Sequence, residues 1–194
     1  MSKDFSICSF NVFGNLEIKA KNPDFINIIS IYDIVFLNEC WLADTTNVDI
    51  KNYSCFVKAR NRRKKAKRNS GGLCILIKND LFNMFEKIEW DFEDGFILKT
   101  KKPCTVNGQH LFCIFVYLKP ANSSRNDLIT DKDDFDQLCE KITELKTRGQ
   151  LLVLGDLNAR TGNLCDLYNS TSLSNNNYSP DFFIMTLTLP LMTL

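Results

Sequence analysis

The sequence has very little histidine: among its 194 residues the only one is His110. Its 8 cysteines include no Cys-x-x-Cys pair, so the ligand spacing typical of zinc sites is missing. Several cysteines instead lie inside apolar runs, where a free thiol packs as a small hydrophobic side chain. This usage argues against zinc chemistry and indicates a reducing compartment, which predicts an intracellular protein of the nucleus or cytoplasm.

Long apolar runs and an excess of one charge are also missing. No apolar stretch reaches the ~20 residues that span a bilayer, and the first residues do not form a secretory signal, so we expect no membrane association. The formal net charge is +1, which gives no global attraction to nucleic acid. With 44% hydrophobic and 24% charged residues, the composition predicts a globular domain with a sizeable core.

Short, continuous apolar runs are present throughout the chain. Because they are mostly continuous rather than alternating, they indicate strands that are covered on both faces. The predicted strands are Phe5–Phe13, Asp33–Leu37, Tyr53–Val57, Leu73–Ile77, Gly95–Thr100, Leu111–Leu118 and Leu151–Leu154.

Two segments have the pattern of helices. Asn22 followed by Pro23 predicts a capped helix start. The clearest helix is predicted from about Thr130 to Lys146, with acidic residues at its start. Its predicted buried stripe consists of Phe135, Leu138, Cys139, Ile142 and Leu145. Strands interleaved with helices predict an α/β domain with sheets inside and helices outside.

Polar side chains stand where the apolar runs end: Asn11, Glu39, Tyr117, Asp156 and Asn158. Taken singly, each has an ordinary structural explanation as a solvated loop residue, turn, cap or core phenol. In an α/β sheet, however, residues that follow strands reach the edge where ligands bind. If these ends converge, their oxygens suit Mg²⁺, with Mn²⁺ as a second option, and a phosphate substrate.

The residues that follow the strands belong to five longer segments: Ser9–Gly14, Asp33–Leu42, Ser70–Ile77, Val116–Pro120 and Leu154–Gly162. These segments resemble the endonuclease/exonuclease/phosphatase family and occur in the order of that family. The Gly-Asp-Leu-Asn-Ala-Arg-Thr-Gly stretch carries the most specific likeness. The residue pattern as a whole resembles most the endonuclease domains of non-LTR retrotransposons.

The resemblance implies two packed β-sheets flanked by helices, a four-layer α/β sandwich that hydrolyses phosphodiesters with Mg²⁺. It implies that Asn11 contacts or positions the reacting phosphate and that Glu39 binds the metal. It also implies that Tyr117 donates a hydrogen bond near the phosphate. Asp156 would align or activate the attacking water, and Asn158 would help to hold the phosphate.

One family element is missing from this sequence. The family carries a Ser-Asp-His triplet on a later strand, and none of the 194 residues forms it. His110 opens an apolar run and is interpreted as structural. We therefore expect a fold that is incomplete at its C-terminus: a domain over residues 1–165, and residues 166–194 as a loop and incomplete last part.

A dense basic run precedes the Ser-Gly-Gly segment and consists of Lys58, Arg60, Arg62, Arg63, Lys64, Lys65, Lys67 and Arg68. It is either a solvated loop, a nuclear-localisation signal or a surface that contacts the phosphate backbone of DNA. As DNA-binding candidates we select Arg62, Arg63, Lys64, Lys65 and Arg68.

The favoured function is a DNA endonuclease of retrotransposon origin, with impaired activity because the triplet is missing and with a reverse transcriptase as a partner in an intact element. One alternative is a phosphatase of the same fold. Another is a catalytically inactive remnant that binds nucleic acid.

Overall fold

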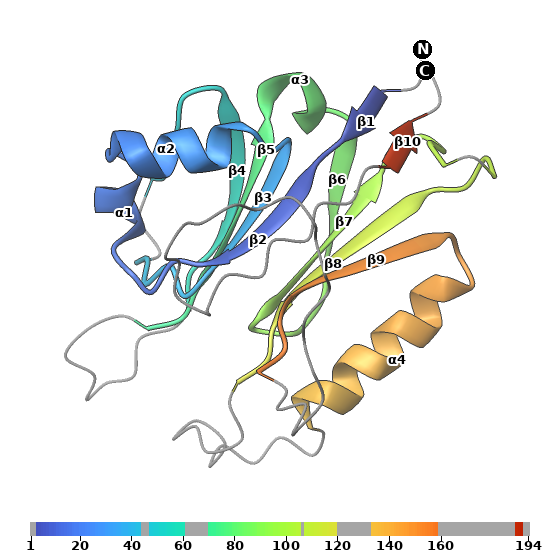
Figure 1. Ribbon diagram of the computed structural model, residues 1–194. Helices are drawn as coiled ribbons and strands as arrows, with labels where there is room; N and C mark the ends of the chain where they lie inside the picture. Colours follow the sequence, from blue (N-terminus) through green and yellow to red (C-terminus); the bar gives the residue numbers. More distant parts are fainter. Residues whose placement is uncertain are drawn as a thin grey trace, which may run out of the picture.

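Two four-stranded sheets form the centre of the computed structural model, which describes residues 3–43, 47–60, 70–105, 107–119, 133–158 and 189–191 (Figure 1). The first sheet has the order β2-β3-β5-β4 and the second has the order β6-β7-β8-β9. Strands of the first sheet are β2 (Ile7–Asn11), β3 (Ile34–Asn38), β4 (Tyr53–Lys58) and β5 (Leu73–Lys78). Strands of the second are β6 (Phe85–Ile88), β7 (Gly95–Thr100), β8 (Leu111–Tyr117) and β9 (Gln150–Asp156). A short antiparallel pair joins β1 (Lys3–Phe5) to β10 (Leu189–Leu191).

Each sheet contains one parallel pair among antiparallel neighbours. β2 runs parallel to β3, with Asn11 opposite Asn38 at the carboxyl end. β8 runs parallel to β9, with Tyr117 opposite Asp156 at the corresponding end. The register therefore sets four polar side chains at the carboxyl ends of two strand pairs, one pair in each sheet.

The main core lies between the two sheets. Residues of alternate positions on β3, β5, β7 and β8 face one another there, as the two-residue period of a strand requires. Phe36 of β3 and Phe115 of β8 are fully buried and bring their ring centroids within 5.3 Å. This contact fixes the two sheets against each other and, with them, the strand ends.

Helices cover the outer faces of the sheets. α1 (Leu16–Lys19) and α2 (Pro23–Ser30) pack on the outer side of the first sheet through Leu16 and Ile29. α4 (Asp134–Lys146) packs on the outer side of the second sheet through Leu138 and Leu145. α2 and α4 accordingly lie on opposite sides of the molecule (Figure 1). The predicted four-layer α/β sandwich is confirmed for the described residues.

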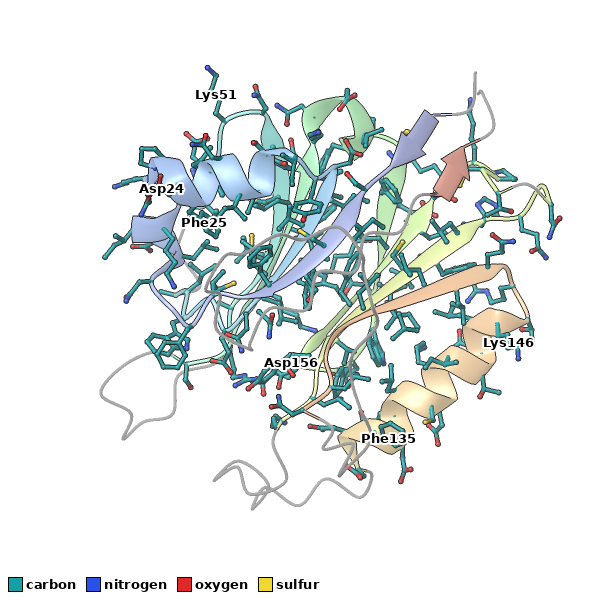
Figure 2. All side chains as sticks on the ribbon, in the orientation of Figure 1. Asp24, Phe25, Lys51, Phe135, Lys146 and Asp156 are labelled. Carbon is teal, nitrogen blue, oxygen red and sulfur yellow. The ribbon has the colours of Figure 1, made fainter. Side chains whose placement is uncertain are left out.

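The predicted helices are confirmed with one correction. The Asn22 side chain accepts a hydrogen bond from the Asp24 N–H at 2.8 Å, as expected of a cap. The described part of α4 begins at Asp134, and Thr130 lies outside the described residues. The predicted stripe of α4 was too wide, because Phe135 (labelled in Figure 2) is 53% exposed and Cys139 is exposed as well. Of the predicted stripe, only Leu138, Ile142 and Leu145 pack against the sheet.

Three short elements were not predicted from the sequence. β6, α1 and α3 (Asn79–Phe82) are 4 residues each, too short to display a periodic pattern.

Every cysteine in the described part of the chain is a free thiol, and five of these thiols are buried. None of the helices in the described ranges has the length and apolar character required to cross a bilayer.

Candidate active site

The carboxyl ends of β2, β3, β8 and β9 bring the predicted site residues together. The Asn11 Nδ2 group donates to Asp156 Oδ2 at 3.5 Å, which links the two sheets across 145 residues of sequence. The Tyr117 hydroxyl hydrogen-bonds with the Glu39 carboxylate, which links them a second time. Asp156 lies at the end of β9, on the side where the first sheet approaches (Figure 2). Four side chains predicted from separate motifs therefore form one cluster.

Glu39 is held by several donors. Its Oε2 atom accepts from the Trp41 Nε1–H at 2.8 Å and from the Gly71 N–H at 3.1 Å, and its carboxylate also bonds Tyr117. Its backbone has φ +55°, an uncommon conformation for a residue with a Cβ. A hydrogen bond of 2.6 Å from the Gly14 N–H to the Glu39 carbonyl holds that conformation. Such constrained backbone is characteristic of functional sites.

Tyr117 lies at the inner rim of the core and is 8% exposed. Burial raises the pKa of its phenol, and the nearby carboxylates of Glu39 and Asp156 raise it further. Tyr117 is therefore a neutral hydrogen-bond donor across the physiological pH range.

Asn158 follows β9 and is fixed by its neighbours. Its Nδ2 group donates to the Leu118 carbonyl at 2.7 Å, and its backbone N–H donates to Asp156 Oδ1 at 3.0 Å. The side chain is exposed and keeps one further N–H on Nδ2. Asn158 thus lies beside Asp156 in a defined orientation and is accessible to a ligand.

Sequence reasoning missed Arg60, which lies directly beneath this cluster. Its guanidinium donates to Asp94 Oδ1 through both Nε, at 2.9 Å, and Nη2. The same group lies 5.6 Å from the centroid of the Tyr117 ring. It also fills the space beside Gly71, where a Cβ atom would approach the guanidinium carbon to 2.2 Å at a backbone φ of +67°. Arg60 therefore packs against Tyr117 and Gly71, two of the groups that hold Glu39.

Asn38 was also missed. Its side chain is fully buried on the inner face of β3, in register with Asn11. Among the described residues, neither its Nδ2 nor its Oδ1 atom has a hydrogen-bond partner. A buried amide without a partner is costly, and a bound polar species such as water or an ion would satisfy it. The sequence could have indicated Asn38, because its amide comes directly before Glu39, the predicted metal ligand.

The donor set fits a hard divalent cation. A carboxylate offers about four acceptor positions, and the contacts to Trp41, Gly71 and Tyr117 leave Glu39 with capacity for a cation. Within the described ranges no three acidic, histidine or cysteine side chains gather in one place. Mg²⁺ requires fewer protein ligands than that, because it is bound by one or two carboxylates together with water and phosphate. Glu39 and the oxygens of Asn11 and Asp156 would supply such ligands.

The predicted DNA-binding residues Arg62, Arg63, Lys64, Lys65 and Arg68 lie outside the described residues. In the sequence they fall between β4 and β5, and β4 ends and β5 begins at the end of the first sheet where β3 finishes. Arg60 and Gly71, on either side of these residues, both contact the site.

His110 precedes β8, at the other end of the strand from Tyr117, and its Nδ1 lies 2.6 Å from the Thr100 carbonyl oxygen.

Comparison with known proteins decides the family. The profile of the endonuclease/exonuclease/phosphatase family matches residues 8–189, nearly the whole chain. The chain belongs to this family. Enzymes of the family generally depend on a divalent metal, in agreement with the donor set at the strand ends. No match to the chain is found among curated proteins.

Solved structures share the fold of this family member. The 3′ phosphatase NExo from Neisseria, bound to a product DNA hairpin, matches with a TM-score of 0.55 and 15% identity, over 82% of this chain and 60% of its own. ANGEL2, a 2′,3′-cyclic phosphatase, matches with a TM-score of 0.53 and 18% identity, over 83% and 55%. The human Nocturnin catalytic domain matches with a TM-score of 0.50 and 13% identity, over 81% and 65%. The chain thus spans less than two thirds of the length of each.

Proposed function

We propose that this chain is a metal-dependent phosphodiesterase domain that hydrolyses the backbone of DNA, of the type found in retrotransposon endonucleases. The observation that carries the proposal is the pair of contacts from Asn11 to Asp156 and from Tyr117 to Glu39. These contacts gather oxygen ligands and hydrogen-bond donors from both sheets at one point. That combination serves a bound cation and a phosphoryl group.

Each residue of the cluster has a chemical role in the proposal. Asp156 accepts a proton from the attacking water or orients that water. The remaining N–H of Asn158 would donate to a phosphoryl oxygen. The single O–H of Tyr117 would turn from Glu39 to a phosphoryl oxygen when the substrate binds, because negative charge develops on these oxygens during the reaction. Asn11 fixes the Asp156 carboxylate and contacts the phosphate.

Glu39 holds the cation in this proposal, together with oxygens of Asn11 and Asp156. Mg²⁺ is the expected ion, with Mn²⁺ as a substitute. When bound, the ion neutralises charge on the phosphate. The protein prepares the position beforehand, because Trp41, Gly71 and Tyr117 fix the Glu39 carboxylate.

The finer parts of the proposal concern origin and rate. The Gly-Asp-Leu-Asn-Ala-Arg-Thr-Gly motif supports a retrotransposon-type endonuclease, for which a reverse transcriptase is the expected partner. The 194 residues contain no Ser-Asp-His triplet, which supports slow turnover by this chain alone. The same observation favours the second candidate, an inactive nucleic-acid-binding domain.

A plasmid-nicking assay tests the proposed function. We expect slow, Mg²⁺-dependent nicking that EDTA stops and that Glu39→Gln and Asp156→Asn each reduce at least 100-fold. Asp24→Asn, an exposed carboxylate on α2, is the matched control and should leave the rate unchanged. DNA binding with no more nicking than the Asp156→Asn variant produces would support the inactive domain instead.

The basic run is tested by binding and its salt dependence. Replacing Arg62, Arg63, Lys64 and Lys65 by glutamine should weaken DNA binding and lower the slope of log K against log salt by about 1 for each phosphate that is no longer neutralised. The control replaces four exposed lysines elsewhere on the chain. Equal effects of the two sets would remove the DNA-binding role of the basic run. The control lysines are Lys21, Lys51, Lys101 and Lys102.

A further inference from the structure

An exposed aromatic pair lies at the rim of the candidate site. The ring of Phe13 is 74% exposed, and its centroid lies 5.3 Å from that of Trp41. A single exposed apolar ring is common on protein surfaces and by itself indicates nothing. What distinguishes this pair is its location: the Trp41 Nε1–H donates directly to Oε2 of Glu39, at 2.8 Å.

The aromatic pair is also held by a hydrogen bond to Asn11, the site residue at the end of β2. The Phe13 backbone N–H donates to Asn11 Oδ1 at 3.0 Å, and Asn11 in turn contacts Asp156. Between them, Gly14 allows the close approach of the indole, because a Cβ atom there would lie 2.0 Å from the Trp41 ring. The two rings therefore have a set position relative to Glu39 and Asn11. A preorganised aromatic surface binds a flat ligand with little loss of conformational entropy.

We propose that Phe13, supported by Trp41, is a stacking surface for one unpaired nucleobase of the strand whose phosphate is bound at Glu39 and Asp156. The proposal rests on the proposed function and adds to it the form of the substrate. A base inside a duplex is covered by its neighbours, whereas a base in a single strand or at a local opening can stack on a protein ring. The domain thus binds DNA that is unpaired next to the bound phosphate.

The observations favour a nucleobase over a broader apolar partner. Among the exposed large hydrophobic side chains of the described residues, Phe13 and Leu157 lie next to site residues, and of these two only Phe13 has an aromatic ring. One ring offers far less area than the several hundred Å² typical of a protein-binding patch. Every base has a π-face, so stacking tolerates all four bases, and little sequence preference is expected at this position.

Anisotropy measurements with labelled single-stranded oligonucleotides test the proposal. Two probes of equal length and charge are compared, one with normal nucleotides and one with abasic sugars at its central positions. Phe13→Ala should weaken binding of the normal probe about 5- to 150-fold and leave binding of the abasic probe unchanged. Phe13→Tyr should restore binding, and Phe135→Ala, an exposed phenylalanine on α4, is the matched control.

A second measurement uses fluorescence. The chain has 2 tryptophans, so Trp90→Phe leaves Trp41 as the single emitter. Its emission should be quenched by the normal probe and much less by the abasic probe. Equal affinity of the Phe13→Ala and unchanged chains for the normal probe overturns the stacking role, while nicking and phosphate-backbone binding remain. Failure of the unchanged chain to bind either probe overturns this inference, whereas the proposed function is overturned only if plasmid nicking is absent as well.

Discussion

Arg60 is a positively charged side chain with only 5% of its surface exposed, and its neighbours explain its position. Asp94, also buried, accepts two hydrogen bonds from the guanidinium. Lys119 Nζ lies 3.7 Å from the other oxygen of Asp94 and 3.2 Å from Asp134 of α4. This network supports the packing of Arg60 on Tyr117 and Gly71. At the scale of the residue, the site is held by a buried ion pair beneath it.

Arg60→Met should destabilise the fold by about 3–5 kcal/mol, because it leaves the carboxylate of Asp94 buried without its principal partner. Adding Asp94→Leu should recover most of that stability, since both charges are then removed. Urea unfolding of the single and double variants measures the difference. Equal instability of the two variants would assign the effect to poorer packing and not to the unpaired charge.

The helix α4 shows how one element is fixed to a sheet. Asp133 caps its start, Asp134 and Asp136 lie in its first turn and Lys146 in its last, as the helix dipole favours. The buried stripe is narrow, with Leu138 and Leu145 packed against the second sheet. At the scale of the element, α4 is attached through two buried leucines, with Ile142 partly buried beside them.

Leu145→Ala should cost about 2–5 kcal/mol, because the side chain is fully buried and its removal leaves a cavity. Phe135→Ala should cost much less, although it removes a larger side chain, because that ring is 53% exposed. Thermal unfolding of both variants checks the order. A greater destabilisation by Phe135→Ala would restore the wider stripe predicted from the sequence.

At the scale of the whole molecule, contacts between strands far apart in sequence hold the first sheet together at both of its ends. At the end remote from the site, Asp33 accepts from the Ser6 N–H at 2.8 Å and its hydroxyl at 3.0 Å, and pairs with Lys78 at 3.0 Å. These contacts join the starts of β2 and β3 to the end of β5. Burial alone raises the pKa of Asp33, but the bonds to Ser6 and Lys78 outweigh it and lower that pKa below its ordinary value of 3.8.

This lowered pKa predicts an acid dependence of stability. The folded chain binds the Asp33 proton more weakly than the unfolded chain does, so the stabilisation is complete above pH values near 3.8 and is lost as the pH falls through the folded pKa. Asp33→Asn should therefore lower the melting temperature at pH 7 and reduce its further decrease at acid pH. Melting curves between pH 7 and pH 3 measure this, and parallel decreases in both chains would contradict it.

Much of the fold could be predicted from the sequence, since continuous apolar runs mark strands that are buried on both faces. Seven predicted strands correspond to strands of the structure, and Asn22 caps α2 as expected. β6, α1 and α3 could not be predicted, because 4 residues carry too little periodicity. The exposure of Phe135 could not be predicted either, because it depends on where α4 meets the sheet.

The sequence by itself determined the strands, the family and the residue types that follow each strand: two carboxylates, two amides and a phenol. Only the tertiary structure decided that Asn11 meets Asp156 and that Tyr117 meets Glu39. It also decided that Arg60, which in the sequence is one more cation of a basic run, is buried against Asp94. The physical reason is that local pattern specifies which face of an element is buried, whereas pairing across 145 residues depends on how the two sheets pack together.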